Sequence, residues 1–140
     1  MRVLPFNVIL LLATCSLPIG TAQAEQWAED GDGRWYSAED IERGQAVFVA
    51  NCAVCHGARA QGATVGSLTA PPLNGSGHSA HHGLDYLLEQ VANGGARTGG
   101  KMPAFAAVLN ESERRAAIAW VQSLWPDEAY RNWQRMHANH

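Results

Sequence analysis

The pattern Cys52-Ala53-Val54-Cys55-His56 constrains this chain more than any other feature of its sequence. It places two thiols three positions apart, with an imidazole directly after the second one. Thiols at this spacing, at the end of a helical turn, can reach the two vinyl groups on one edge of a porphyrin, and the imidazole then lies under the iron. The pattern therefore predicts a covalently attached haem c, bound through Cys52 and Cys55 with His56 as the proximal ligand.

Other sites that use paired cysteines fit the rest of the sequence less well. A thioredoxin-like redox pair follows a strand in a βαβ unit, and no such strand is evident before Cys52. A tetrahedral zinc site needs four ligands, and the only other cysteine in the chain is Cys15. A disulfide between Cys52 and Cys55 would be strained and would close almost no loop. Haem attachment is therefore the favoured interpretation.

The first 24 residues have the pattern of a secretory signal peptide. Arg2 provides a positive charge, an apolar run covers residues 8–13, and small residues at 22–24 form a cleavage site of the A-x-A type. We therefore expect residues 1–24 to be removed, leaving no stable membrane span, and the protein to work in the periplasm or another exported compartment. Retention of this segment as an anchor and lipid modification of Cys15 remain alternatives.

Three later segments have the apolar spacing of helices. The first begins with Ser37 as N-cap, and its apolar face contains Ile41, Gly44, Phe48 and Cys52. The second covers residues 84–92, and the third begins at Asn110, with Glu113 completing a capping box. No segment shows sustained strand-type alternation, so we expect a small all-α fold of three to five helices with long loops.

The loop before the last of these helices supplies a second candidate ligand. Residues 99–105 place Met102 beside Pro103 in a turn-rich segment. A methionine in such a loop is poorly placed for core packing, whereas its thioether is a known axial ligand of haem iron. We therefore predict Met102 as the distal ligand, with Pro103 restricting the backbone next to it.

The order of these elements is similar to that of the class I cytochrome c family. The resemblance runs from about residue 37 to residue 125, most of the chain after the predicted signal peptide, and rests on the cysteine–histidine motif, the Pro-rich loop and the Met-Pro loop. It implies a cytochrome c fold wrapped around one haem, with the carbonyl of Pro71 accepting a hydrogen bond from the ring of His56. It also implies that Gly44 lies where the first helix crosses the last one, near Trp120.

Domain boundaries follow from the same comparison with the family. We expect an N-terminal extension at 25–36, the cytochrome c domain at 37–125 and a helical C-terminal extension at 126–140. In the last segment Tyr130, Trp133 and Met136 have helical spacing, which predicts a short helix that covers an edge of the core.

The resemblance implies a monohaem carrier of single electrons between redox proteins. Two axial ligands from the protein argue against activation of oxygen or peroxide, so we expect no enzyme activity beyond service as a subunit or partner of an oxidoreductase. Ten Lys and Arg against 13 Asp and Glu exclude a basic nucleic-acid binder. Lys101 is the only lysine, so the chain has no ring of lysines for docking an acidic partner.

Two other functions remain open at this stage. Met102 could be displaced by a small ligand, which would make the chain a haem-based sensor or an enzyme subunit. Three histidines, His78, His81 and His82, lie within five positions and could bind copper or zinc in an exported compartment. The simpler interpretation of these histidines is an exposed polar loop or a contact with the haem propionates.

Overall fold

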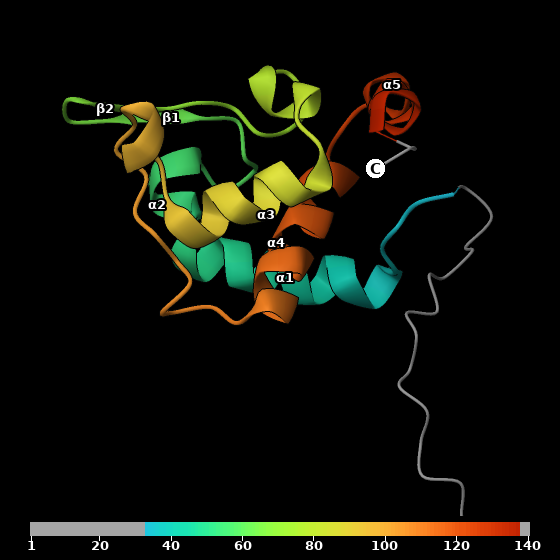
Figure 1. The fold of residues 1–140 in the computed structure, drawn as a ribbon, viewed down its shortest axis with the longest axis horizontal. Helices are drawn as coiled ribbons and strands as arrows, with labels where there is room; N and C mark the ends of the chain where they lie inside the picture. The colour runs from blue at the N-terminus through green and yellow to red at the C-terminus, as the bar shows by residue number, and fades with distance from the viewer. Residues whose placement is uncertain (1–32, 138–140) are drawn as a thin grey trace, which may run out of the picture.

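A computed structural model describes residues 33–137, so the predicted signal peptide lies outside the described residues. This part of the chain is mostly helical (Figure 1). Its elements are α1 (Ala38–Asn51), α2 (Ala53–His56), β1 (Ala63–Val65), β2 (Leu68–Ala70), the 3-10 helix η1 (His78–His81), α3 (Leu84–Asn93), the 3-10 helix η2 (Ala96–Thr98), α4 (Glu111–Ser123) and α5 (Asp127–His137). Among the described residues, no helix has the length and apolar character needed to cross a membrane.

Helices α1 and α4 cross at very close range in the centre of the fold (Figure 1). A Cβ atom on Gly44 would lie 1.9 Å from the carbonyl oxygen of Ala116, so only glycine allows this approach of the two backbones. One turn later, the ring of Phe48 packs against Trp120 with centroids 4.6 Å apart. The expected contact at Gly44 is therefore present, and it explains a residue that costs about 1 kcal/mol in a helix interior relative to alanine.

Replacing Gly44 with alanine should test this crossing. The new methyl group would overlap a backbone oxygen, which cannot move without separating the helices, so we expect a loss of about 2–4 kcal/mol in the free energy of unfolding. Denaturant unfolding of the holoprotein measures the loss. The matched control is Gln45→Ala at an exposed position of the same helix, expected to change stability by less than about 0.5 kcal/mol. Equal stabilities of the two variants would contradict the close crossing.

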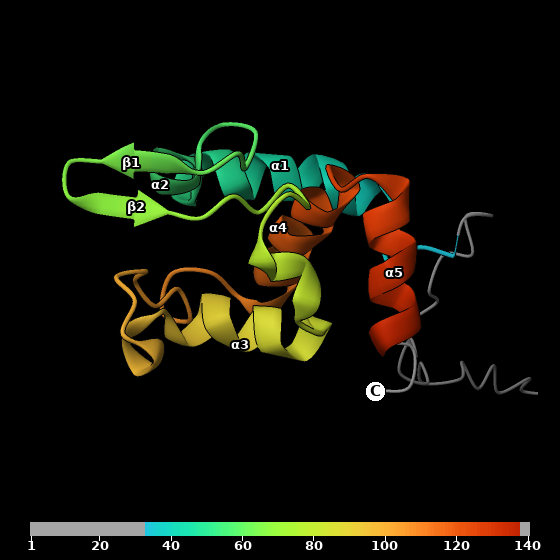
Figure 2. The same cartoon turned by 90° about the horizontal axis from the view of Figure 1, so that it is seen from above.

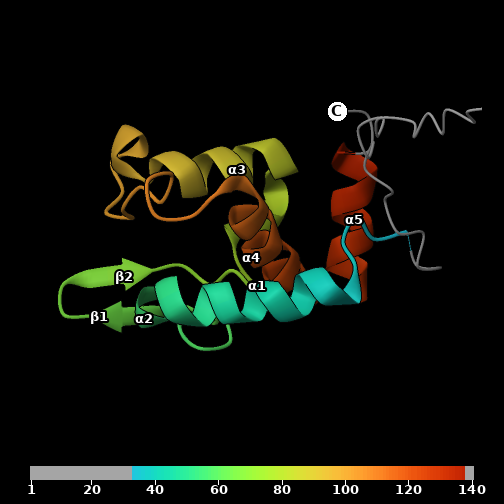
Figure 3. The same cartoon turned by 90° about the horizontal axis from the view of Figure 1, so that it is seen from below.

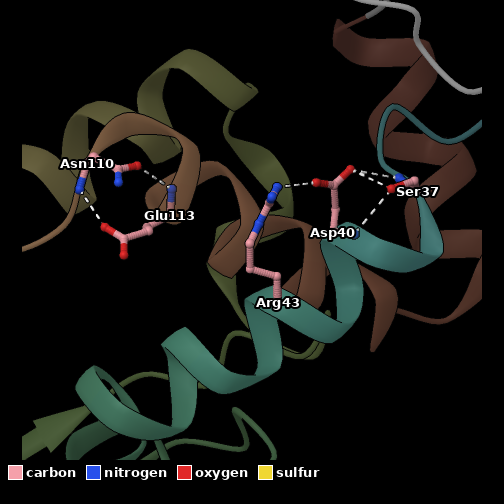
Figure 4. Close-up of polar contacts among 5 residues, drawn as sticks. All are labelled: Ser37, Asp40, Arg43, Asn110 and Glu113. Carbon is pink, nitrogen blue, oxygen red and sulfur yellow. Dashed lines mark hydrogen bonds and ion pairs between the residues drawn. The ribbon is translucent and has the colours of Figure 1, made fainter.

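Both crossing helices begin with a reciprocal capping box (Figure 4). The Ser37 hydroxyl accepts from the Asp40 N–H at 3.2 Å, and the Asp40 carboxylate accepts from the Ser37 N–H at 3.0 Å. At α4, the Asn110 side chain accepts from the Glu113 N–H at 3.0 Å and the Glu113 carboxylate accepts from the Asn110 N–H at 2.8 Å. The N-caps predicted at Ser37 and Asn110 are confirmed, and Arg43 adds an ion pair to Asp40 at 2.6 Å.

The expectation of an all-α chain is wrong at one place, the antiparallel hairpin of β1 and β2. The two strands pair residues 63–65 with 68–70 through a two-residue turn, in which Gly66 has a φ of +61°. Each strand is only three residues long, which is too short to show an alternating pattern. The strands are stabilised by packing against α2, a tertiary contact that local sequence does not reveal.

The C-terminal extension forms α5, which stands across the N-terminal end of α1 (Figures 2 and 3). Tyr130 and Trp133 of α5 are buried in an aromatic cluster with Tyr36 and Trp125, whereas Met136 is 52% exposed. The helix expected in this extension is therefore present over Asp127–His137, and it covers an edge of the core. The predicted residues 138–140 of the extension lie outside the described part of the chain.

Candidate haem-binding site

The cysteine–histidine motif folds as one helical turn that continues α1. The Cys52 N–H donates to the carbonyl of Phe48 at 2.8 Å, and the His56 N–H donates to the carbonyl of Cys52 at 2.9 Å. Gly57 ends the turn with a φ of +79°. Because residues three apart are neighbours on a helix, Cys52 and Cys55 lie on adjoining turns, and neither is in a disulfide. Both thiols are therefore available for separate covalent bonds.

The environment of Cys52 does not suit a thiol used for redox exchange. Burial, with a smaller contribution from the neighbouring Cys55, raises the pKa of the Cys52 thiol to about 11. Cysteines that exchange disulfides have lowered pKa values, because the thiolate is the reactive form. The described residues also contain no βαβ unit around the motif. These observations favour haem attachment over the thioredoxin-like interpretation.

His56 is buried, and one hydrogen bond fixes its ring. Its Nδ1 atom lies 3.0 Å from the carbonyl oxygen of Pro71. A carbonyl can only accept, so Nδ1 carries a proton, and in the neutral ring the lone pair is then on Nε2. A neutral imidazole in this tautomer is the form that binds iron through Nε2. The structure thus shows the contact between Pro71 and the His56 ring that the resemblance implies.

The hairpin joins the two backbone positions that hold His56. Just before β1, the Gly62 N–H donates to the carbonyl of His56 at 2.8 Å, and just after β2 the Pro71 carbonyl accepts from the His56 ring. Gly62 has a φ of +78°, and a Cβ atom there would lie 2.8 Å from the backbone nitrogen of Pro72. Gly62 is therefore required for this geometry, and sequence reasoning did not find it because the contact is tertiary.

Met102 lies in the segment between η2 and α4, and its backbone is attached to the end of α3. The Gly95 N–H donates to the Met102 carbonyl at 2.9 Å, and a Cβ atom on Gly94 would lie 2.6 Å from the same oxygen. The Phe105 N–H donates to the carbonyl of Val91 at 3.1 Å. These contacts fix the backbone at Met102 and in the residues just after it, and the Met102 side chain is half-buried.

The two candidate ligands belong to opposing layers of the fold (Figures 2 and 3). His56 ends α2 in the layer that also contains α1 and the hairpin, and Met102 follows η2 in the layer of α3. Helix α2 and the segment that follows η2 both lie toward the end of the molecule away from α5. Axial ligands of a haem must approach the iron from opposite faces of the ring, and this arrangement is compatible with that requirement.

The exposure of the apolar face of helix α3 indicates whether the site suits an apolar cofactor. The apolar residues of the helix have the spacing of a single face, yet no residue of the helix is buried. Leu84 at the start of this face packs against the aromatic cluster, and Leu87, Leu88 and Val91 continue the face while only partly buried. An amphipathic helix of a folded domain buries its apolar face against another apolar surface. The half-exposed face of α3, with the donor set of two thiols, a neutral imidazole and a thioether, therefore fits a haem.

The rings of the three histidines around η1 lie close together. The ring of His78 is 5.1 Å from that of His81 and 4.9 Å from that of His82, between centroids. His82 also stacks on Tyr86 at 4.0 Å, and burial together with His78, His81 and His137 lowers the pKa of His82. In the described part of the chain, no group of three or more His, Cys, Asp or Glu residues is placed to bind a metal ion. The predicted copper or zinc site is therefore not supported.

Comparison with known proteins identifies relatives of this chain. A family model described as "Cytochrome C oxidase, cbb3-type, subunit III" matches residues 39–121. The cbb3-type cytochrome c oxidase subunit CcoP of Azospirillum sp. (strain B510) is 33% identical over 96 residues, which are 66% of this chain and 31% of that protein. The subunit FixPc of Rhizobium leguminosarum bv. viciae is 37% identical over 83 residues, 59% of this chain and 27% of that protein.

A shorter similarity links the chain to another class of cytochrome. A cytochrome c-553-like protein of Synechocystis sp. is 40% identical over 55 residues, which are 39% of this chain and 46% of that protein. The chain spans less than a third of the length of the two oxidase subunits. No solved structure matches it. Helix α5 lies outside the range of the family model.

Proposed function

The chain belongs to the cbb3-type cytochrome c oxidase subunit III family of c-type cytochrome domains, and we propose that it transfers single electrons between redox proteins with His56 and Met102 as axial ligands. A domain of this family contains one covalently bound haem c. When bound, the haem supplies an iron centre that cycles between the ferric and ferrous states. The proposed place of action is the periplasm or another exported compartment.

The geometry of His56 supports this proposal most directly. The residue follows two free thiols, its ring is buried, and its protonated Nδ1 donates to Pro71 at 3.0 Å. This hydrogen bond orients Nε2 and increases the electron density that the imidazole donates. Cys52 and Cys55 are proposed to form the two thioether bonds.

Met102 is proposed as the sixth ligand of the iron, and its thioether raises the reduction potential of the haem. A thioether favours the ferrous state relative to a second imidazole, so a His/Met pair gives a higher reduction potential. With both axial positions filled by side chains, no position is left for a substrate. The protein residues therefore orient the ligands and exclude water, and the proposed activity is electron transfer without bond chemistry.

The names of the relatives favour an oxidase as one redox partner. Two of them are subunits of cbb3-type cytochrome c oxidases, and we propose that this chain donates electrons to an oxidase of that type, either as a component or as a separate carrier. The alternative role as a ligand sensor needs Met102 to leave the iron. The Met102 carbonyl accepts from the Gly95 N–H just after α3, and Phe105 is hydrogen-bonded to Val91 of α3, which favours a fixed ligand.

An anaerobic redox titration of the full-chain holoprotein tests this function. We expect a single one-electron wave and an unchanged spectrum when carbon monoxide is added to the reduced protein, because both axial positions are occupied. The reduced protein should also be reoxidised rapidly by membranes that contain a cbb3-type oxidase, and slowly by membranes that lack one. Carbon monoxide binding by the native reduced protein would support the sensor function instead.

A further inference from the structure

The β1–β2 hairpin exposes apolar side chains beside the haem-binding site. Val65 and Leu68 are directly paired across the hairpin, so their side chains lie on the same face, and they are 46% and 42% exposed. The hairpin packs against α2, where Val54 is 74% exposed between the two cysteines. Exposed apolar residues on adjoining elements differ from the single ones scattered over most protein surfaces, and they indicate a contact surface.

The chain around these residues is almost free of charge. Arg59 is the sole Asp, Glu, Lys or Arg between Gly44 and Leu84, although the chain has 13 acidic and 10 basic residues in total. A surface on which Arg59 is the one charged side chain can be covered with little desolvation of ions, and it provides little attraction for a charged partner. Its electrostatic complement is therefore another uncharged surface.

The hairpin is also well placed to bring a partner close to the site. Both of its ends are bonded to His56, through Gly62 on one side and Pro71 on the other. Figures 2 and 3 show it projecting at the end of the molecule that contains α2, away from α5. A protein that contacts Val65 and Leu68 thus lies next to the segment that orients the proposed proximal ligand.

We propose that Val54, Val65 and Leu68 form the docking patch for a redox protein that presents an uncharged, apolar face. This inference rests on the proposed electron-transfer function. The patch is small, which suits a transient complex that forms and dissociates at each electron transfer. Docking is governed by apolar contact, so the rate of electron transfer depends little on ionic strength.

Electron self-exchange of the holoprotein tests the docking patch, because a second copy of the chain itself presents such a face. The rate is measured by NMR line broadening in mixtures of oxidised and reduced protein. Between about 0.01 M and about 0.5 M salt we expect less than a threefold change in rate. The double variant Val65→Ser/Leu68→Ser should lower the rate about tenfold, because it removes the apolar contact without adding charge. The control Val108→Ser/Met136→Ser changes exposed apolar residues elsewhere and should leave the rate unchanged.

Two further measurements distinguish a failure of the docking proposal from a failure of the proposed electron-transfer function. The hairpin variant should keep the wild-type reduction potential and the wild-type rate of oxidation by hexacyanoferrate, a small reagent that needs no docking patch. A wild-type rate of self-exchange in the hairpin variant, or a steep dependence on salt, would overturn the docking proposal alone. Failure of the wild-type protein to take up one electron would overturn the electron-transfer function itself.

Discussion

Replacing both Cys52 and Cys55 with alanine is expected to eliminate covalently bound haem. After denaturation in acid and extraction with organic solvent, the wild-type polypeptide should remain pigmented and the double variant should be colourless, because only the thioether bonds survive this treatment. Each single variant should keep one bond and a reduced yield of holoprotein. The measurement is the haem content of the denatured chain, by absorbance and by mass.

Val54→Ala is the matched control for the cysteine variants. It changes a residue inside the same motif that is 74% exposed, and it should leave haem content unchanged. The colourless double variant should also fold poorly, because the apolar face of α3 would then lack its cover. A pigmented denatured chain in the double variant would show that the haem is bound elsewhere.

Met102→Ala should leave the haem attached but lower its reduction potential. Loss of the thioether removes the ligand that favours ferrous iron, and a decrease on the order of 0.1 V is expected, since axial ligands shift haem potentials over a range of about 0.8 V. The reduced variant should also bind carbon monoxide at the vacated position. Potentiometric titration, followed optically, measures the change.

Met136→Ala provides the control for Met102, because Met136 is the other methionine of the described chain and is 52% exposed on α5. Its replacement should change neither the potential nor the reactivity with carbon monoxide. Equal reduction potentials for the Met102 variant and the wild type would overturn the assignment of Met102 as a ligand. An unchanged potential in the Met136 variant would show that the decrease is specific to Met102.

The features that could be predicted from sequence are those that depend on residues close together in the chain. The caps at Ser37 and Asn110 involve side chains three positions apart, and the cysteine–histidine motif lies within a single turn. The helical spacing of Tyr130 and Trp133 was enough to indicate α5. For these elements local hydrogen bonding and apolar periodicity decide the structure.

The features that sequence reasoning missed depend on contacts between distant segments. The hairpin forms because α2 supports two strands that are too short to be recognised alone. Gly62 is needed because the chain returns past it at Pro72, and Gly94 because the backbone of Met102 lies against it. Spacing alone also could not tell that the rings of His78, His81 and His82 lie against one another.

The absorption spectrum of the oxidised full-chain protein at neutral pH tests whether His56 and Met102 are the two axial ligands of a single haem c, as proposed for an electron carrier. We expect a low-spin ferric spectrum with the weak far-red band that arises from a methionine sulfur bonded to iron. A high-spin spectrum, or a low-spin spectrum without that band, would contradict this ligand assignment.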